Sequence, residues 1–209
     1  MEDGHTQMNA KKETCATYDK YARDYEEKAK DYIEKYIQND FNLFLQKLRG
    51  KKILDLGGGP GRDSIRFKQR GFHPICIDIS KAMVKLCKNK GIEAYEMDIE
   101  KLDFENNTFD GVWAYTSLLH IPKNQIKQVL KKIRAILKSK GVFYIGMKAG
   151  NFEGFQESKS YPNHKRYFAL YTKDELEKLL SEFFEILSFS KVEIDGEHIY
   201  INFLCKNNT

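Results

Sequence analysis

The chain has 209 residues, of which 41% are hydrophobic and 31% charged, and its formal net charge is +5. This length predicts one domain that can bury a sizeable core, and the composition is typical of a soluble globular protein. No apolar run approaches the roughly 20 residues of a membrane span, and the N-terminal segment lacks the apolar core of a signal peptide, so we expect a cytoplasmic protein that does not enter a membrane.

The positive charge is spread along the chain. Lysines on expected helix faces, such as Lys123, Lys127 and Lys131, alternate with acidic residues. A nucleic-acid interface normally concentrates its positive charge and interleaves it with aromatic side chains, so we do not expect a nucleic-acid partner. The four cysteines form no CxxC pair and have no metal-ligand spacing, and we expect no metal site.

Hydrophobic periodicity predicts a regular alternation of helices and strands after an irregular start. We expect residues 1–16 to be flexible, residues 17–48 to form two helices in which tyrosines recur at helical spacing, and residues 51–205 to form an α/β core. Strands are expected at 52–56, 73–79, 92–98, 110–115 and 142–148, and helices between them at about 62–70, 80–91 and 123–137. Parallel neighbours need crossover helices, so this order predicts a mostly parallel sheet with helices on both faces.

The C-terminal part breaks this alternation. A polar loop is expected at 149–166, followed by a helix from Thr172 with Glu175 placed for a capping box. Two strands, at about 184–193 and 197–205, are joined by Asp195-Gly196, a pair that favours a β-hairpin. We therefore predict a single Rossmann-like domain over the whole chain, with a seven-stranded sheet closed by a C-terminal antiparallel hairpin.

A glycine-rich turn follows the first expected strand, in the segment ILDLGGGPGR. Asp55 lies near the end of the strand, and glycines then occur at positions 57, 59 and 61. Glycine permits positive φ and close approach of the backbone to a ligand, and such turns at strand ends bind nucleotide-like molecules. Arg62 stands where a dinucleotide fingerprint has its last glycine, which favours an adenosine with an amino-acid tail over a pyrophosphate.

Two further acids follow expected strands. Asp78 ends the second strand, where a carboxylate can accept hydrogen bonds from ribose hydroxyls, although it could instead cap the next helix. Ser80 is the better cap. Asp98 follows the third strand and can accept from the exocyclic amine of adenine, or be an exposed loop acid. Three apolar residues beside these acids are expected to flank the adenine or to lie in the core: Ile79, Met83 and Ile99.

This order of a glycine turn and acids at strand tips resembles class I S-adenosylmethionine-dependent methyltransferases, whose first motif is close to LDLGCGxG. The resemblance covers about residues 17–205 and is closest to the UbiE-like, type 11 kind. It implies S-adenosylmethionine as cofactor, with S-adenosylhomocysteine as product, and an N-terminal helical lid at 17–48. The contacts that it implies are Tyr18, Tyr25, Asp55, Gly57, Gly59, Gly61, Asp78, Ile79, Met83, Asp98, Ile99 and Tyr115. Tyr18 and Tyr25 could equally be part of a buried helical stripe.

The fourth expected strand ends in the segment YTSLLHIP. In the methyltransferase fold this tip faces the methyl donor, so Tyr115, Ser117 and His120 are the candidates for chemistry. Imidazole titrates near neutral pH, so His120 is either a general base or a cofactor contact.

A second polar cluster is expected to close over the substrate. It contains Lys148, Arg166 and Tyr167, and the two basic residues would anchor an acidic acceptor. Alternatively, these are ordinary surface charges on a solvated loop.

Several absences narrow the acceptor. The tip of the fourth strand has no Pro-Pro-aromatic sequence, which disfavours methylation of an adenine or glutamine amino group, and it has no cysteine to attack a pyrimidine ring. We expect transfer of a methyl group to an oxygen or nitrogen of a small molecule. The alternatives are an RNA or protein methyltransferase and a non-catalytic S-adenosylmethionine-binding protein, and the oligomeric state is left open.

Overall fold

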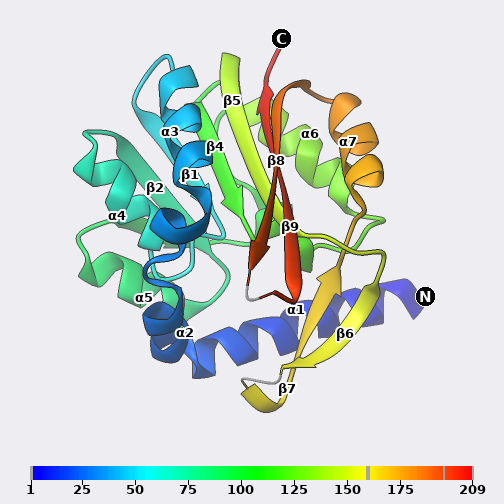
Figure 1. The fold of residues 1–209 in the computed structure, drawn as a ribbon. Helices are drawn as coiled ribbons and strands as arrows, with labels where there is room; N and C mark the ends of the chain where they lie inside the picture. Colours follow the sequence, from blue (N-terminus) through cyan, green and yellow to red (C-terminus); the bar gives the residue numbers. More distant parts are fainter. Residues whose placement is uncertain (1, 159–160, 195, 209) are drawn as a thin grey trace.

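The computed structural model in Figure 1 describes residues 2–158, 161–194 and 196–208 and contains a seven-stranded sheet in the order β3-β2-β1-β4-β5-β9-β8. Its strands are β1 (Lys52–Leu56), β2 (His73–Asp78), β3 (Glu93–Glu96), β4 (Phe109–Tyr115), β5 (Leu137–Lys148), β8 (Glu185–Ile194) and β9 (His198–Lys206). The α-helices are α1 (Glu2–Lys20), α2 (Ala22–Ala29), α3 (Gln38–Lys47), α4 (Arg62–Gln69), α5 (Lys81–Asn89), α6 (Ile126–Ile136) and α7 (Lys173–Ser181). Within these ranges no helix is both long and apolar enough to cross a lipid bilayer.

The pairing of the strands confirms the predicted fold class. β1 pairs in parallel with β2 and β4, and the parallel pairs β2–β3 and β4–β5 extend the sheet on either side. β9 runs antiparallel to both of its neighbours, β5 and β8. The predicted C-terminal hairpin is therefore present, although Asp195 of its expected turn lies outside the described residues.

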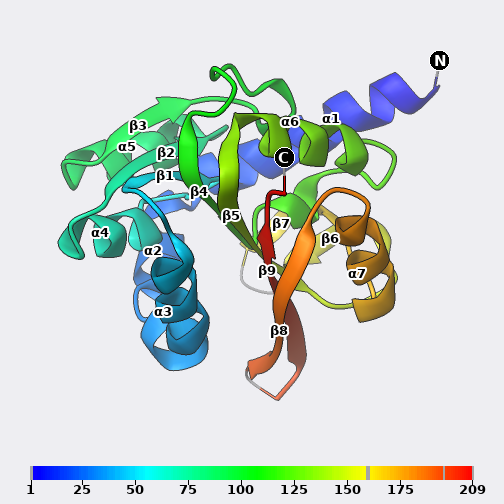
Figure 2. The same ribbon diagram turned by 90° about the horizontal axis from the view of Figure 1, so that it is seen from above.

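Helices pack on both faces of the sheet, as the second view in Figure 2 shows. Buried side chains of α6 and α7, such as Leu130 and Leu180, form one core cluster with the strands, while α3 and α4 contribute to another. In the second cluster the ring of Phe41 stacks on that of Phe67, with centroids 4.9 Å apart. Because α3 belongs to this core, the part of the expected lid at 17–48 that forms α3 does not cover the sheet edge.

Two segments differ from the sequence prediction and support each other. Residues 2–20 form one helix, where a flexible segment and a helix from residue 17 were expected, and the expected loop at 149–166 forms the hairpin of β6 (Glu153–Ser158) and β7 (Tyr161–Ala169). The backbone N–H of Tyr167 donates to Thr14 Oγ1 at 3.0 Å, and Thr17 Oγ1 donates to the Lys165 carbonyl at 3.1 Å. In Figure 1, α1 lies beside this hairpin and runs across the lower end of the sheet.

The register of the parallel strands brings three chain segments together at this lower end. Leu56 of β1 is level with Ile77 of β2, and the N–H of Gly58 donates to the Ile77 carbonyl at 3.1 Å. At the tip of β4, Tyr115 is level with Gly146 of β5. Because all these strands end at the same edge, the loops that follow β1, β2 and β4 lie side by side at the end of the sheet that α1 crosses.

Candidate functional site

A cavity lies between the carboxyl ends of the strands and the N-terminal helices. It contains about 980 Å³ of space between protein atoms, its open mouth included. Twelve residues proposed from the sequence for the cofactor or the chemistry line it: Tyr18, Tyr25, Asp55, Gly57, Gly59, Asp78, Ile79, Met83, Asp98, Ile99, Tyr115 and His120. Ser117 lines the cavity too. The structure thus brings together residues that lie up to about a hundred positions apart in the sequence.

The glycine turn presents bare backbone to this cavity. Gly59 has a φ of 56°, and an added Cβ would meet only the sulfur of Met83, at 3.9 Å. A Cβ at Gly57 would lie 2.4 Å from the Cβ of Ser117, so the turns after β1 and β4 touch there. Gly61 is not among the lining residues; its missing side chain leaves room for Cys87, whose sulfur would be 2.6 Å from a Cβ. Gly61 therefore serves helix packing rather than the cavity.

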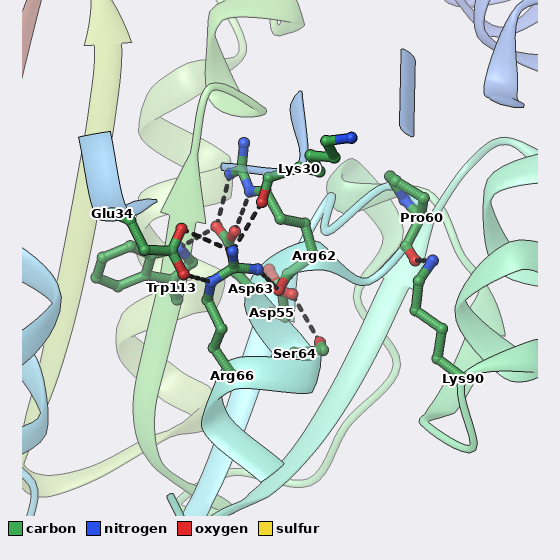
Figure 3. Close-up of polar contacts among 10 residues, drawn as sticks. All are labelled: Lys30, Glu34, Asp55, Pro60, Arg62, Asp63, Ser64, Arg66, Lys90 and Trp113. Atoms are coloured by element: carbon green, nitrogen blue, oxygen red, sulfur yellow. Dashed lines mark hydrogen bonds and ion pairs between the residues drawn. The ribbon is translucent and has the colours of Figure 1, made fainter. Parts of the chain in front are cut away.

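Asp55 packs against the glycine turn, because a Cβ added at Gly58 would lie 2.5 Å from its carboxylate, and Figure 3 shows its hydrogen bond with Ser64. Its carboxylate accepts a hydrogen bond of 2.6 Å from the hydroxyl of Ser64 and is only 2% exposed. Burial, together with the nearby carboxylate of Asp63, raises the pKa of Asp55 to about 7. Asp55 is thus both part of the wall and a support of the turn.

Asp78 organises the end of β2. One carboxylate oxygen accepts from the N–H of Gly59 at 3.0 Å, and the other from the N–H of Ser80 at 2.8 Å. Ser80 in turn caps α5 by accepting from the N–H of Met83 at 3.2 Å, as expected from the sequence. Burial raises the pKa of Asp78 to about 6, against the backbone donors, which favour the charged form. A carboxylate has about four lone-pair sites, so Asp78 can accept a further hydrogen bond from a ligand.

The N-terminal helix α1 is attached to the same elements by charged side chains. Lys11 forms an ion pair of 2.8 Å with Asp98 and a second one with Glu100. Asp19 accepts hydrogen bonds from the hydroxyl of Ser80 at 2.6 Å and from the N–H of Ala82 at 3.0 Å. Asp98, which the sequence left as a possible exposed loop acid, is therefore held between α1 and the cavity.

His120 belongs to a buried chain of hydrogen bonds. Its Nδ1 lies 2.6 Å from the carbonyl oxygen of Tyr167, which can only accept, so Nδ1 carries the proton. Its Nε2 is then the acceptor for the hydroxyl of Tyr18, at 2.9 Å, and that hydroxyl accepts from Arg166 at 3.1 Å. Burial lowers the pKa of His120 to about 4, helped by the positive charge of Arg166. The imidazole is therefore neutral at physiological pH.

The tip of β4 carries side-chain hydroxyl groups that make no hydrogen bond within the described part of the chain. The hydroxyls of Tyr115 and Ser117 are buried and have no hydrogen-bond partner among the described residues. Between them Thr116 has a φ of 60°, a conformation that costs a β-branched residue on the order of 1–3 kcal/mol and is concentrated at functional sites. No group of three or more His, Cys, Asp or Glu side chains that could hold a metal ion occurs in the described ranges, and the expectation of no metal stays a prediction.

The residues predicted to bind the substrate are not among those that line the cavity. Arg166 donates a hydrogen bond to Tyr18, which lines the cavity, but does not line it itself. The hydroxyl of Tyr167 donates to Glu153 at 2.8 Å, so this side chain serves the hairpin, and the carbonyl group of Tyr167 orients His120. Lys148 ends β5, and burial and the charge of Arg166 both lower its pKa.

Sequence reasoning missed several residues that line the cavity, among them the polar residues Lys11, Thr14 and Arg62. The first two fell in the segment expected to be flexible. Their spacing with Tyr18 is three and four residues, which places these three on one face of α1 and was the available signal. Arg62 was noted only as a departure from a dinucleotide fingerprint.

The fold and the site together define the class of protein. The strand order, with a glycine turn after β1 and one antiparallel strand near the C-terminal edge, is that of class I methyltransferases. Residues 53–141 match the family described as methyltransferase domain. The chain therefore shares the fold of class I methyltransferases, and its central part is similar to a methyltransferase domain.

Comparison with known proteins gives methyltransferases of low sequence identity. Phosphoethanolamine N-methyltransferase 3 of Arabidopsis thaliana is 23% identical over 181 residues, which are 82% of this chain and 36% of that protein. The chain thus spans about a third of the length of this relative.

Two solved structures share the fold. The 1,6-didemethyltoxoflavin-N1-methyltransferase of Burkholderia thailandensis, with 1,6-didemethyltoxoflavin and S-adenosylhomocysteine bound, has a TM-score of 0.69 and 20% identity, covering 93% of this chain and 88% of its own. The cyclase SpnF has a TM-score of 0.63 and 17% identity, covering 81% and 80%. A shared fold therefore includes proteins of different reactions, and the chemistry must be argued from the site.

The hydrogen bonds of His120 predict its protonation state. Because burial disfavours the imidazolium, we expect the ring to stay neutral, with the proton on Nδ1, at every pH above about 5. Two-bond ¹H–¹⁵N NMR spectra distinguish the tautomers, and the loss of one set of signals in His120→Gln identifies the residue. Protonation near pH 6.5, the ordinary value for histidine, or a proton on Nε2, would contradict this arrangement.

Proposed function

We propose that the protein is an S-adenosylmethionine-dependent methyltransferase that methylates an oxygen or nitrogen of a small molecule. One observation carries the proposal: the glycine turn and the acids Asp78 and Asp98 share a single cavity with the half-buried pair Tyr18–His120. A cavity that only bound a nucleotide would not need a neutral, oriented imidazole at its wall.

The cavity has the features that this cofactor requires. Backbone is accessible at Gly59, where the amino-acid tail would lie, and Asp78 keeps free lone pairs for the ribose hydroxyls. Three apolar side chains line the part assigned to the adenine: Ile79, Met83 and Ile99. The hydroxyls of Tyr115 and Ser117, buried without a partner in the described part of the chain, are available for the ligand.

The helix α1 would act as the lid. Lys11 and Asp19 bind it to the loops after β3 and β2, so α1 closes the cavity on the side of the proposed adenine and ribose sites. A closed lid excludes water and holds donor and acceptor in a fixed orientation, which supplies much of the rate of a bimolecular transfer. The pair of Lys11 with Asp98 also means that adenine would meet a carboxylate already oriented by the lid.

The cofactor supplies a methyl group on a sulfonium, which an acceptor atom with a lone pair can attack. The protein's own part is to move the proton that the acceptor loses. The Tyr18 hydroxyl can take this proton while it passes its own to Nε2 of His120, because it already donates to that nitrogen. Arg166, which donates to the same hydroxyl, stabilises negative charge on it during the exchange. His120 is neutral at physiological pH, so its Nε2 carries no proton before the transfer.

The charges near the cavity favour an acceptor with an acidic group. Burial and then the positive charge of Arg166 lower the pKa of Lys148, while the carboxylate of Glu197 raises it, so the two positive charges lie close enough to repel each other although one acid is already near. An acidic group on the acceptor would relieve this repulsion, consistent with the phosphate named in the Arabidopsis relative. We also propose a cytoplasmic location, because the four cysteines, Cys15, Cys76, Cys87 and Cys205, are all free thiols, as is usual in a reducing compartment.

The first experiment is calorimetric titration of the protein with S-adenosylmethionine and S-adenosylhomocysteine, with NAD as the control. We expect micromolar binding of both sulfur ligands, because adenosine and the amino-acid tail each have built contacts, and no binding of NAD, whose pyrophosphate finds Arg62 in place of the last fingerprint glycine. Absence of binding by both sulfur ligands would overturn the proposed function.

The ribose contact is tested by Asp78→Ala. Loss of charged hydrogen bonds should weaken S-adenosylhomocysteine binding about tenfold or more. Asp103→Ala is the control: it removes an exposed acid from the connection between β3 and β4 and should leave the affinity for S-adenosylhomocysteine unchanged. Circular dichroism and thermal unfolding check that the fold remains, because Asp78 also binds the backbone of Gly59. Unaltered affinity in Asp78→Ala would show that the ribose lies elsewhere.

The proton relay is tested by His120→Ala and Tyr18→Phe. Each should reduce methyl transfer roughly a hundredfold or more, the usual contribution of a positioned base, while S-adenosylhomocysteine affinity changes only a few-fold. The assay follows labelled methyl groups from S-adenosylmethionine to phosphoethanolamine and to other small amines and phenols. If His120→Ala abolishes cofactor binding instead, the histidine belongs to the cofactor site.

A further inference from the structure

The helix α1 carries two rows of polar side chains, one on each side of Tyr18. Side chains at a spacing of four residues form the first row: Lys11, Cys15 and Asp19. Side chains at a spacing of three residues form the second row: Thr14 and Thr17. Because each residue of an α-helix is turned by about 100° from the one before it, Tyr18 lies between the two rows. Contacts on both sides therefore decide where its hydroxyl points.

The two rows bind different parts of the protein. The threonines bond to the backbone of β7, which belongs to a two-stranded sheet apart from the main one. The first row bonds to loops of the main sheet: Cys15 Sγ donates to the Ile79 carbonyl at 3.5 Å, and Asp19 accepts from Ser80 at the start of α5. In Figure 1, α1 accordingly lies beside the hairpin and crosses the lower end of the main sheet. Bonds along one row would let α1 turn about β7, whereas bonds along both rows fix it.

Lys11 is the positively charged member of the first row, and its partners are held in place. Its Nζ pairs with Asp98 at 2.8 Å and also with Glu100. The other oxygen of Asp98 accepts from the N–H of Glu100 at 2.9 Å, which fixes its carboxylate to the loop after β3. Burial lowers the pKa of Lys11, but the hydrogen bonds and charges of the two acids outweigh this effect and raise it above the ordinary value. A cation between two oriented carboxylates contributes more than an isolated exposed pair.

Lys11 is two helical turns away from Tyr18. Seven residues of α-helix rise about 10 Å, so the ion pairs and the hydrogen bond from Tyr18 to His120 lie at separate points of one helix. Since the hydrogen bonds within the helix keep two turns stiff, a shift of α1 at Lys11 also moves the Tyr18 hydroxyl. A misplacement of about 1 Å can cost roughly a hundredfold in rate.

We propose that Lys11 is a positioning residue for the proton relay: its ion pairs with Asp98 and Glu100 fix α1 so that Tyr18 donates to His120. For its effect on methyl transfer the inference rests on the proposed function, whereas the position of Tyr18 can be measured without any ligand. Asp98 then serves two purposes, because the acid proposed for the adenine also holds Lys11. A cofactor bound at Asp98 and the relay at His120 are thereby coupled through one helix.

The test observes Nε2 of His120 by two-bond ¹H–¹⁵N NMR in the protein without ligand. The ¹⁵N chemical shift of an unprotonated ring nitrogen reports whether it accepts a hydrogen bond. Lys11→Met removes the ion pairs, Lys11→Arg keeps a cation, and Lys12→Met is the matched control at the exposed neighbouring position. Tyr18→Phe gives the shift for complete loss of the bond. Circular dichroism checks the fold, and Asp98→Asn, which weakens the same pair from the other side, replaces Lys11→Met if that variant does not fold.

Lys11→Met should move the Nε2 resonance in the direction given by Tyr18→Phe, and Lys11→Arg should return it towards the wild-type position. Lys12→Met should leave it unchanged. Methyl transfer at saturating S-adenosylmethionine should fall about tenfold or more in Lys11→Met and stay within a few-fold of wild type in the other two lysine variants. An unmoved resonance or unchanged transfer in Lys11→Met, an equal movement in Lys12→Met, or no recovery in Lys11→Arg would each overturn the inference.

The two proposals fail separately in this experiment. If the resonances respond as expected while the wild type neither binds S-adenosylmethionine nor transfers a methyl group, the proposed function is wrong and the positioning of Tyr18 by Lys11 stands. If the wild type transfers a methyl group and the resonance of Lys11→Met stays in place, the inference alone is overturned.

Discussion

The parallel pairing of β1 with both β2 and β4 is the constraint on which the rest of the structure depends. The chain leaves β1 towards β2 on one side, and β4 returns on the other, so the connections diverge and leave a crevice at the carboxyl ends of these strands. The glycine turn, Asp78 and the segment after Tyr115 all line that crevice. Each lies at the end of a strand or directly after it, and the rigid sheet fixes their relative positions.

The site is built from buried charges whose cost is offset by specific hydrogen bonds. Asp78 is held by two backbone N–H groups, Asp63 by an arginine and an indole, and His120 by a carbonyl and a hydroxyl. Burying such groups without partners costs several kcal/mol each, on the order of 2–7 kcal/mol for a neutral polar group and more for a charge. A site held in this way is oriented before any ligand arrives, which is the condition for electrostatic stabilisation of a reaction.

The helix α1 is attached differently from the core. Most helices in proteins are stabilised by packing of an apolar face, and α1 has few apolar residues. Polar contacts dominate its attachment: Lys11 to Asp98, Asp19 to α5, and Thr14 and Thr17 to β7. The helix and the hairpin β6–β7 therefore stabilise each other, and neither has the hydrophobic pattern that marks the elements of the sheet.

This difference separates what could be predicted from what could not. The parallel sheet, its C-terminal hairpin and the gathering of Asp78, Asp98 and His120 at one edge follow from local patterns, because strand periodicity and glycine turns are short-range signals. The helix at 2–20, the hairpin at 153–169 and the bond from Tyr18 to His120 depend on partners about a hundred or more positions away. A linear pattern contains no information on such pairs, so the position of α1 and the protonation state of His120 are decided only when the chain is folded.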